Sequence, residues 1–461
     1  MRKTSLSIAV GLALAQFIPA PVTAADTTED FIEVNTSISL ADTTKAQTKT
    51  YNYDKNAIYK HTGRIELKGQ GGKKDLTIDV KNGSGDFIVR DRYAPIQLDN
   101  SDIHLKFNSN LVMEGMEYAG IMYGSGNVPR ELNITGDFIY RDSYATAIKA
   151  NTGYSRGNLF VITIDGKADL RNVSIHGNNK ATASGSLLDL GATDFEAKQG
   201  VFIDNIDGNT AGDWNTAIFL VNGSLKAENQ NIEITNINFN VASRVNTSIY
   251  AQSSPVKAKN ILIKGLSNKY DNDLYGYING TEANTVSDSL TICDIRNLKT
   301  GNSLALYMEA DSSSRYGDTN FNVGTLTIDN VVANDGIAEG MSVGGAARDN
   351  GKLNAQAGSV SINGVHGTRG AVGAEISNGA SFTSANNFAV TDVKATAGDA
   401  IGLMLGAKTT VGDTLSVQKV RGTTSAVGVQ FDGTQAFSSK VVQVKDIKAS
   451  DGSAIGLLAH Q

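Results

Sequence analysis

The stretch VTDVKATAGDAIGLML, residues 390–405, decides the fold because its skeleton returns twice further along the chain. It recurs as VQKVRGTTSAVGVQF from residue 417 and as VKDIKASDGSAIGLLA from residue 444, each time with different surface residues. The same structural unit therefore occurs three times in this part of the sequence. Self-similarity at a fixed period is the signature of a repeat architecture.

The first half of this unit, an apolar-x-x-apolar core, occurs ten times between Leu170 and Ile447, at spacings of 27 to 36 residues. Its third position is Asn, Asp or Gly in every copy except the one with Lys419. These three residue types tolerate positive φ better than others, so the chain is expected to turn a corner there in each unit. The predicted corner residues are Asn172, Asn205, Asn236, Gly265, Asp294, Asn330, Gly364, Asp392 and Asp446.

A second apolar strand follows each corner by roughly ten residues, as in AVGAEI from residue 371 and AVGVQF from residue 426. Alternation at period two predicts a half-buried strand with one inward face. The residues expected to point inward are Val372, Ala374 and Ile376, with Val427, Val429 and Phe431 as their equivalents. The copy AEGMSV from residue 338 departs from this pattern, because it places Glu339 at the position of Val372.

Strands that recur only a full unit later are expected to stack on their own copies in the next unit, in parallel and about 4.8 Å apart. The sequence thus predicts an all-β protein, a parallel β-helix (solenoid) of roughly a dozen coils. A β-propeller is the structural alternative, but a four-stranded blade normally takes about 40 to 50 residues.

Composition agrees with this fold and limits the function. The 461 residues include 48 glycines and 5 prolines, a usage typical of many turns between strands. The formal net charge is -6, from 41 basic and 47 acidic residues. The chain therefore lacks the excess of positive charge that would indicate nucleic-acid binding. We expect no cofactor.

The N-terminus resembles an export signal. Arg2 and Lys3 precede the mostly apolar run 6–17, and small residues at 22–24 offer a cleavage site, so residues 1–24 are predicted to be a signal peptide. A buried first helix is the alternative. Residues 25–60 are expected to form an N-terminal cap or polar lead-in, and residues 61–461 the repeats. Cys293 is the only cysteine, which excludes an internal disulfide, and we expect it to be structural.

Three tyrosines in the N-terminal half share one phase of the repeat. Tyr93, Tyr118 and Tyr144 are 25 and 26 residues apart, which would place them on three successive coils. Such a row is either a sugar-binding platform or an aromatic ladder that stabilises the coil, and the second interpretation is favoured. These tyrosines are the weak candidates for a ligand-binding surface.

Catalytic motifs are mostly missing from the sequence. It contains no HExxH, no GxSxG and no glycine loop of the GxxxxGK type. A β-helical polysaccharide lyase or glycoside hydrolase is the alternative function, with Asp91 and Asp142, or Arg90 and Arg141, lining a groove. Both pairs lie in duplicated sequence, and repetition explains them without chemistry. The run Asp271-Asn272-Asp273 is a weak candidate for calcium binding, and a solvated loop is the favoured interpretation.

A cleavable signal, a nearly cysteine-free chain rich in Asn and Gly, and coils of the form apolar-x-Asn-apolar followed by A-I/V-G resemble the passenger region of type V secreted autotransporters. The resemblance covers residues 60–461. It implies a right-handed β-helix displayed at the cell surface or outer membrane of a Gram-negative bacterium, or secreted, and often used in adhesion. It also implies a C-terminal β-barrel translocator as a partner in the full-length protein. The chain departs from the family here, because no segment supplies the alternating strands of that barrel.

The expected function is therefore adhesin-like or structural binding to a host or extracellular protein or glycan, and not catalysis. Contacts are expected at the longer insertions near 207–215, 268–273 and 309–320, because loops on a rigid scaffold carry function. The last unit stops soon after its second strand, which predicts that the repeats are truncated at the C-terminus.

Overall fold

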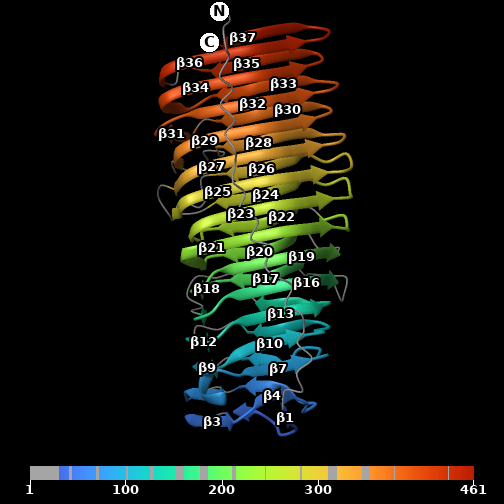
Figure 1. Ribbon diagram of the computed structural model, residues 1–461, viewed down its shortest axis with the longest axis vertical. Helices are drawn as coiled ribbons and strands as arrows, with labels where there is room; N and C mark the ends of the chain where they lie inside the picture. The colour runs from blue at the N-terminus through green and yellow to red at the C-terminus, as the bar shows by residue number, and fades with distance from the viewer. Residues whose placement is uncertain are drawn as a thin grey trace, which may run out of the picture.

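The computed structural model describes residues 31–40, 44–68, 72–99, 102–124, 129–150, 160–176, 185–209, 214–243, 245–280, 283–309, 319–344, 353–377, 379–433 and 436–460. They form a parallel β-solenoid of about 13 turns, which confirms the predicted all-β class and the coil number. Figure 1 shows the coils rising in chain order from the N-terminal strands at one end to the C-terminal strands at the other. The predicted signal peptide, residues 1–24, lies outside the described residues.

Two parallel sheets run along the solenoid, and each strand pairs with its counterpart in the next coil. Sheet A contains β1 (Phe31–Val34), β3 (Gln47–Tyr53), β4 (Asn56–Tyr59), β6 (Lys74–Val80), β7 (Asp86–Arg90), β9 (Ile103–Asn108), β10 (Asn110–Glu114), β12 (Arg130–Ile134), β13 (Phe138–Ser143), β15 (Phe160–Ile164), β16 (Ala168–His176), β18 (Thr193–Ala197), β19 (Val201–Asn209), β21 (Ser224–Phe239), β23 (Val256–Asn268), β25 (Ala283–Asn297), β27 (Thr319–Ala333), β29 (Leu353–Gly367), β31 (Ala380–Ser384), β32 (Phe388–Ala395), β34 (Lys408–Gly422) and β36 (Phe437–Ala449). Sheet B contains β2 (Ser39–Leu40), β5 (Ile65–Leu67), β8 (Ile96–Leu98), β11 (Ala119–Tyr123), β14 (Thr146–Ala150), β17 (Gly185–Gly191), β20 (Trp214–Val221), β22 (Val245–Gln252), β24 (Leu274–Gly280), β26 (Ser303–Met308), β28 (Ile337–Val343), β30 (Gly370–Ile376), β33 (Asp399–Leu405), β35 (Ser425–Asp432) and β37 (Ser453–His460). A single 3₁₀ turn, η1 (Lys81–Gly83), is the one helical element among the described residues.

Sheet A bends once in every coil, at the residue that the repeat motif places third. In the pairing of β19 with β21, Asp204 lies opposite Thr235 and Ile206 opposite Ile237, while Asn205 and Asn236 between them are skipped. A residue with left-handed backbone reverses the side-chain phase and turns the strand through a corner. All ten motif positions have positive φ, from 54° at Asn236 to 73° at Gly265, and Lys419 is among them at 55°.

The N-terminal half of the solenoid has the same corners, but they are harder to recognise in its sequence. Asp91, Gly115 and Asp142 have φ of 49°, 66° and 50° on successive coils. The ten copies of the apolar-x-x-apolar motif start at Leu170, so they do not include these three corners. Their Asp and Gly identities are the signal that could have revealed them.

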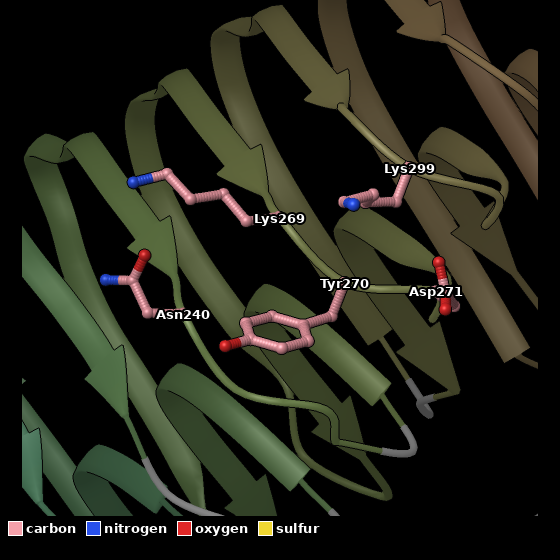
Figure 2. A pocket seen from close by; sticks show the side chains of 5 residues that line it. All are labelled: Asn240, Lys269, Tyr270, Asp271 and Lys299. Carbon is pink, nitrogen blue, oxygen red and sulfur yellow. The ribbon is translucent and has the colours of Figure 1, made fainter.

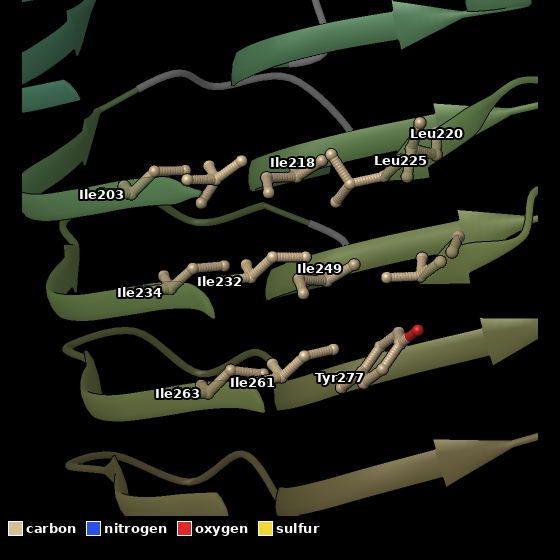
Figure 3. Packing of buried hydrophobic residues seen from close by; sticks show 14 of the residues in the cluster. Ile203, Ile218, Leu220, Leu225, Ile232, Ile234, Ile249, Ile261, Ile263 and Tyr277 are labelled. Atoms are coloured by element: carbon tan, nitrogen blue, oxygen red, sulfur yellow. The ribbon is translucent and has the colours of Figure 1, made fainter. Parts of the chain in front are cut away.

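The core lies between the two sheets and runs the length of the solenoid as ladders of like residues (Figure 3). Ile203, Ile234 and Ile263 stack on successive coils of sheet A and are at most 1% exposed. Ile249 and Tyr277 stack in the same way in sheet B. Fully burying one such side chain contributes about 1.5 to 3 kcal/mol, so each added coil stabilises the coil beneath it.

The predicted inward face of the second strand was partly wrong. In β30, Ala371, Ala374 and Ile376 are fully buried in the core, whereas Val372 is only half-buried and lies outside it. The cause is Gly373, where a Cβ atom would lie 2.3 Å from the Gly402 carbonyl oxygen and 2.4 Å from Val390 Cγ1. The sheets approach so closely that only glycine fits, and the strand bends there and loses simple alternation.

The equivalent strand β35 shows the same change of phase. Val429 is fully buried in the core, as predicted, but Val427 is buried outside the core cluster and Phe431 is only partly buried. Ala426 takes the inward position instead of Val427. Glu339 matches Val372 in the register, so it too lies on the outer side of sheet B and does not interrupt the core.

Stacked strands are already present in the segment predicted as a cap or lead-in. β1 pairs in parallel with β4, and β3 pairs with β6, so the described solenoid begins at Phe31.

In the last coil Val441, Val442 and Leu457 are 44%, 41% and 57% exposed. No helix within the described ranges is long and apolar enough to cross a membrane.

Candidate functional site

The turn that joins β23 to β24, residues 269–273, is the one predicted insertion that the structure describes throughout. Buried Asn268, at the end of β23, holds this turn from inside. Its Nδ2 donates hydrogen bonds to the carbonyl oxygens of Tyr270 (3.2 Å) and Asn272 (2.8 Å), and its Oδ1 accepts one from the Tyr270 amide (3.1 Å). The insertions near 207–215 and 309–320 lie partly outside the described residues.

The next coil repeats this arrangement. Asn297 lies opposite Asn268 in the register and is also fully buried. Its Nδ2 donates to the Asn272 carbonyl at 2.6 Å, and its Oδ1 accepts from the Lys299 amide at 3.1 Å. The hydrogen bonds of two stacked buried asparagines therefore hold the backbone at Tyr270 and Lys299 in place. A buried amide with satisfied hydrogen bonds orders a turn that would otherwise be mobile.

A cavity of about 480 Å³ lies over this turn and is lined by Asn240, Lys269, Tyr270, Asp271 and Lys299. Three successive coils supply these residues, from the ends of β21, β23 and β25. Figure 2 shows Tyr270 at the centre, with Asn240 and Lys269 toward one side and Asp271 and Lys299 toward the other. The Tyr270 side chain is 42% exposed.

The chemistry of this cavity suits an anionic, partly apolar ligand. Two ammonium groups attract carboxylate or sulfate, the aromatic ring offers an apolar face, and Asn240 and Asp271 supply an amide and a carboxylate for hydroxyl groups. No salt bridge of Lys269 or Lys299 is found within the described ranges. The position of the turn was predictable from its length, but the pocket was not, because it depends on which side chains three coils bring together.

The three predicted tyrosines lie on successive coils. The rings of Tyr93 and Tyr118 are stacked, with centroids 4.8 Å apart and planes within 6°. Lys149 Nζ lies 4.4 Å from the Tyr118 centroid and 2.9 Å from its hydroxyl. Tyr144 is 58% exposed and Tyr93 51%. The stacked rings each cover one face of the other, and Lys149 lies over the Tyr118 ring, so these contacts fit a stabilising ladder.

The arginines considered for a polysaccharide groove neutralise a single carboxylate. Arg90 Nε and Arg141 Nε each lie 2.8 Å from Glu114, on the coil between them. Burial alone would raise the pKa of Glu114, but the guanidinium groups of Arg141 and Arg90 outweigh burial and hold that pKa below its ordinary value. These residues form an ion-pair ladder along the solenoid.

The two aspartates considered with them are corner residues. Asp91 and Asp142 both have positive φ, and Asp142 Oδ1 accepts a hydrogen bond of 3.1 Å from Asn172 Nδ2 on the next coil. Similar bonds link later corners, as from Asn205 Nδ2 to Asn172 Oδ1 at 2.8 Å. Asp142 is therefore part of a corner ladder, and Asp91 occupies the equivalent corner position.

The proposed calcium ligands take part in the turn itself. The Asn272 carbonyl accepts from Asn268 and Asn297, and Asp273 Oδ1 accepts from the Asn302 amide at 2.9 Å. The part of the chain that the structure describes holds no group of three His, Cys, Asp or Glu side chains suited to a metal ion. Burial, followed by Asp294, raises the pKa of the Cys293 thiol to about 11, which makes that thiol a poor nucleophile.

The fold and this surface define the class of the molecule as a parallel β-solenoid with polar turns along its edge. No protein-family model matches the sequence, and no curated protein or solved structure is detectably similar to it.

Proposed function

We propose that this chain is an exported, surface-displayed β-solenoid that binds extracellular material through its edge turns, as an adhesin does. The observation that carries the proposal is the cavity over residues 269–273, where Tyr270 and two lysines are held on backbone that buried asparagines fix. A rigid scaffold that presents a preformed polar turn loses little entropy on binding.

The ligand that these side chains fit best is an acidic carbohydrate, such as a chain of uronate or sulfated sugars. Lys269 and Lys299 supply positive charge on neighbouring coils, and Tyr270 supplies the apolar surface between them. The likeness of the sequence to autotransporter passengers supports export and display. A partner barrel in the full-length protein belongs to the same proposal.

The test is binding of the purified protein to an immobilised acidic polysaccharide, with neutral dextran as the comparison ligand. Tyr270→Ala and the double change Lys269→Gln with Lys299→Gln should each weaken binding about tenfold or more, and added salt should weaken it further. Lys408→Gln, at an exposed lysine of β34, is the matched control and should leave binding unchanged.

Equal affinity for dextran, or unchanged binding in both pocket variants, would contradict the proposal. The same samples test the alternative function. Release of unsaturated or reducing-end products that disappears in Asp91→Asn or Asp142→Asn would make the protein a lyase or hydrolase.

A further inference from the structure

The outer side of sheet B carries acidic and tyrosine side chains on neighbouring coils. Tyr275 of β24 lies opposite Leu304 of β26, which lies opposite Glu339 of β28. Tyr307 occupies the adjacent column, three residues along β26. The Tyr275 and Tyr307 rings are 6.2 Å apart between centroids and tilted by 59°. Two aromatic rings and a carboxylate thus share one patch of the surface.

A small cavity of about 150 Å³ opens within this patch. Asp273, Tyr275, Leu304, Ile337 and Glu339 are among the residues that line it. Because one water molecule needs only about 10 to 15 Å³ of such space, the cavity has room for several waters or one small organic group. It is therefore large enough for the head group of a ligand and too small for a whole sugar chain.

The Glu339 carboxyl group that lines this cavity is incompletely hydrogen-bonded. Its Oε1 atom is buried and has no hydrogen-bond partner among the described residues. Glu375 adds a second negative charge nearby, and its Oε1 accepts a hydrogen bond of 2.6 Å from Ser377. Neither carboxylate forms an ion pair with a lysine or arginine in the described part of the chain. Leaving such a group unpaired costs about 1 to 3 kcal/mol, and more when it is charged.

The titratable groups on the packed strands all act in the same direction. Burial, then the charge of Glu375 on β30, raises the pKa of Glu339 to about 8, although Ser342 donates a hydrogen bond to it. Burial, then Asp273 and Glu339, raises the pKa of Tyr275 to about 12. Burial, then Glu309 directly after β26, raises the pKa of Tyr307 above its ordinary value. A positive charge placed among these groups would lower each of these pKa values, and it would stabilise the ionised form of Glu339 most directly.

We propose that the cavity beside Glu339 binds an organic cation, namely an alkylammonium or guanidinium group, which pairs with the Glu339 carboxylate next to the Tyr275 ring. An aromatic neighbour adds cation–π attraction to the ion pair. The described residues offer no third carboxylate arranged to hold a metal ion, so the site suits a compact organic head group. That group can belong to a free amine or to a lysine or arginine side chain of a partner protein.

Calorimetric titration of the full chain with methylguanidinium chloride tests the site. Binding should be about tenfold tighter at pH 9 than at pH 7, because Glu339 is largely ionised only above its pKa of about 8. Binding at pH 7 should release a proton, which appears as a dependence of the heat on the buffer. Glu339→Gln, which keeps the shape and removes the charge, should weaken binding at pH 9 at least tenfold.

Glu228→Gln, at an exposed glutamate of β21, is the matched control and should bind as the unaltered protein does. A short arginine-containing peptide is titrated in parallel. Binding of methylguanidinium supports a site for free cations, and binding of the peptide alone supports a basic side chain of a partner. No binding of either at pH 9, or unchanged affinity in Glu339→Gln, would overturn the proposal. Tyr270→Ala should leave this binding intact, which separates it from the carbohydrate site.

Discussion

Asn330 Nδ2 donates a hydrogen bond of 2.6 Å to Asp294 Oδ1 on the preceding coil, and both residues have left-handed backbone, with φ of 56° and 58°. One side chain thus serves two purposes, since it tolerates the corner conformation and ties that corner to its neighbour. The same relationship links Asn172 to Asp142 and Asn205 to Asn172. A row of such bonds along one edge keeps the coils in register.

Replacing Asn330 by valine should therefore lower the free energy of unfolding by about 2 kcal/mol, because a β-branched side chain fits positive φ poorly and the bond to Asp294 is lost. Asn330→Gly loses only the hydrogen bond and should cost about 1 kcal/mol. Urea unfolding followed by circular dichroism measures both. Equal stability of the valine variant and the unaltered protein would contradict the corner assignment.

The close approach of the next coil at Gly373 predicts a second effect. In Gly373→Ala the new Cβ would meet the Gly402 carbonyl oxygen at 2.3 Å, so the backbone of two coils must shift, at a cost of about 2 to 3 kcal/mol. Gly370→Ala in the same strand is the control, because its nearest neighbour would be Ile337 Cγ1 at an ordinary 3.5 Å. The melting midpoint should fall for the first variant and change little for the second. Equal midpoints for the two variants would argue against a steric role for Gly373.

These two positions show what the sequence could and could not predict. The corners were predictable because positive φ restricts the residue type, and Asn, Asp or Gly then recurs at one position of each unit. The inward face of β30 was not, because Gly373 was interpreted as the outward member of an alternating pair. The real cause is contact with Gly402, in the next coil of the same sheet, and with Val390, in the other sheet.

The candidate sites were even less visible in the sequence. The turn at 269–273 could be predicted as an insertion, but its pocket depends on Asn240 and Lys299 from neighbouring coils. Glu339 was noticed only as a departure from the apolar pattern. Its role follows from residues that the register brings beside it, among them Tyr275, which is 64 positions away in the chain.

The raised pKa of Glu339 makes stability depend on pH in a defined direction. The folded protein keeps this proton up to about pH 8, whereas the unfolded chain releases it near the ordinary glutamate pKa of 4.5. The native state therefore binds more protons between these values, and stability falls as pH rises from about 5 to 8. Glu339→Gln cannot ionise, so its stability advantage over the unaltered protein should grow by roughly 1 to 3 kcal/mol across that range.

Thermal unfolding of both proteins at pH 5 and pH 8 measures this difference. Glu228→Gln again serves as the control, since it makes the same chemical change at an exposed position of β21. If the gap between Glu339→Gln and the unaltered protein were the same at both pH values, the carboxyl would not be held protonated in the folded state.

The stacked register of the coils is the central claim, and the single native cysteine allows a direct test of it. Cys293 of β25 lies opposite Asp329 of β27, 36 residues further along the chain, and both side chains point away from the core. Neighbouring strands place such Cα atoms about 4.8 Å apart, within the range of about 4.4 to 6.8 Å that a disulfide requires. Asp329→Cys should therefore form an intramolecular disulfide with Cys293 under copper–phenanthroline, detected by mass spectrometry of proteolytic fragments.

Thr327→Cys, two residues away on the same face and opposite Thr291, should not, because its diagonal distance to Cys293 is about 7 to 8 Å. Efficient bridging at 329 with none at 327 is the predicted result, and bridging at 327 alone, or at neither position, would contradict the stacked register.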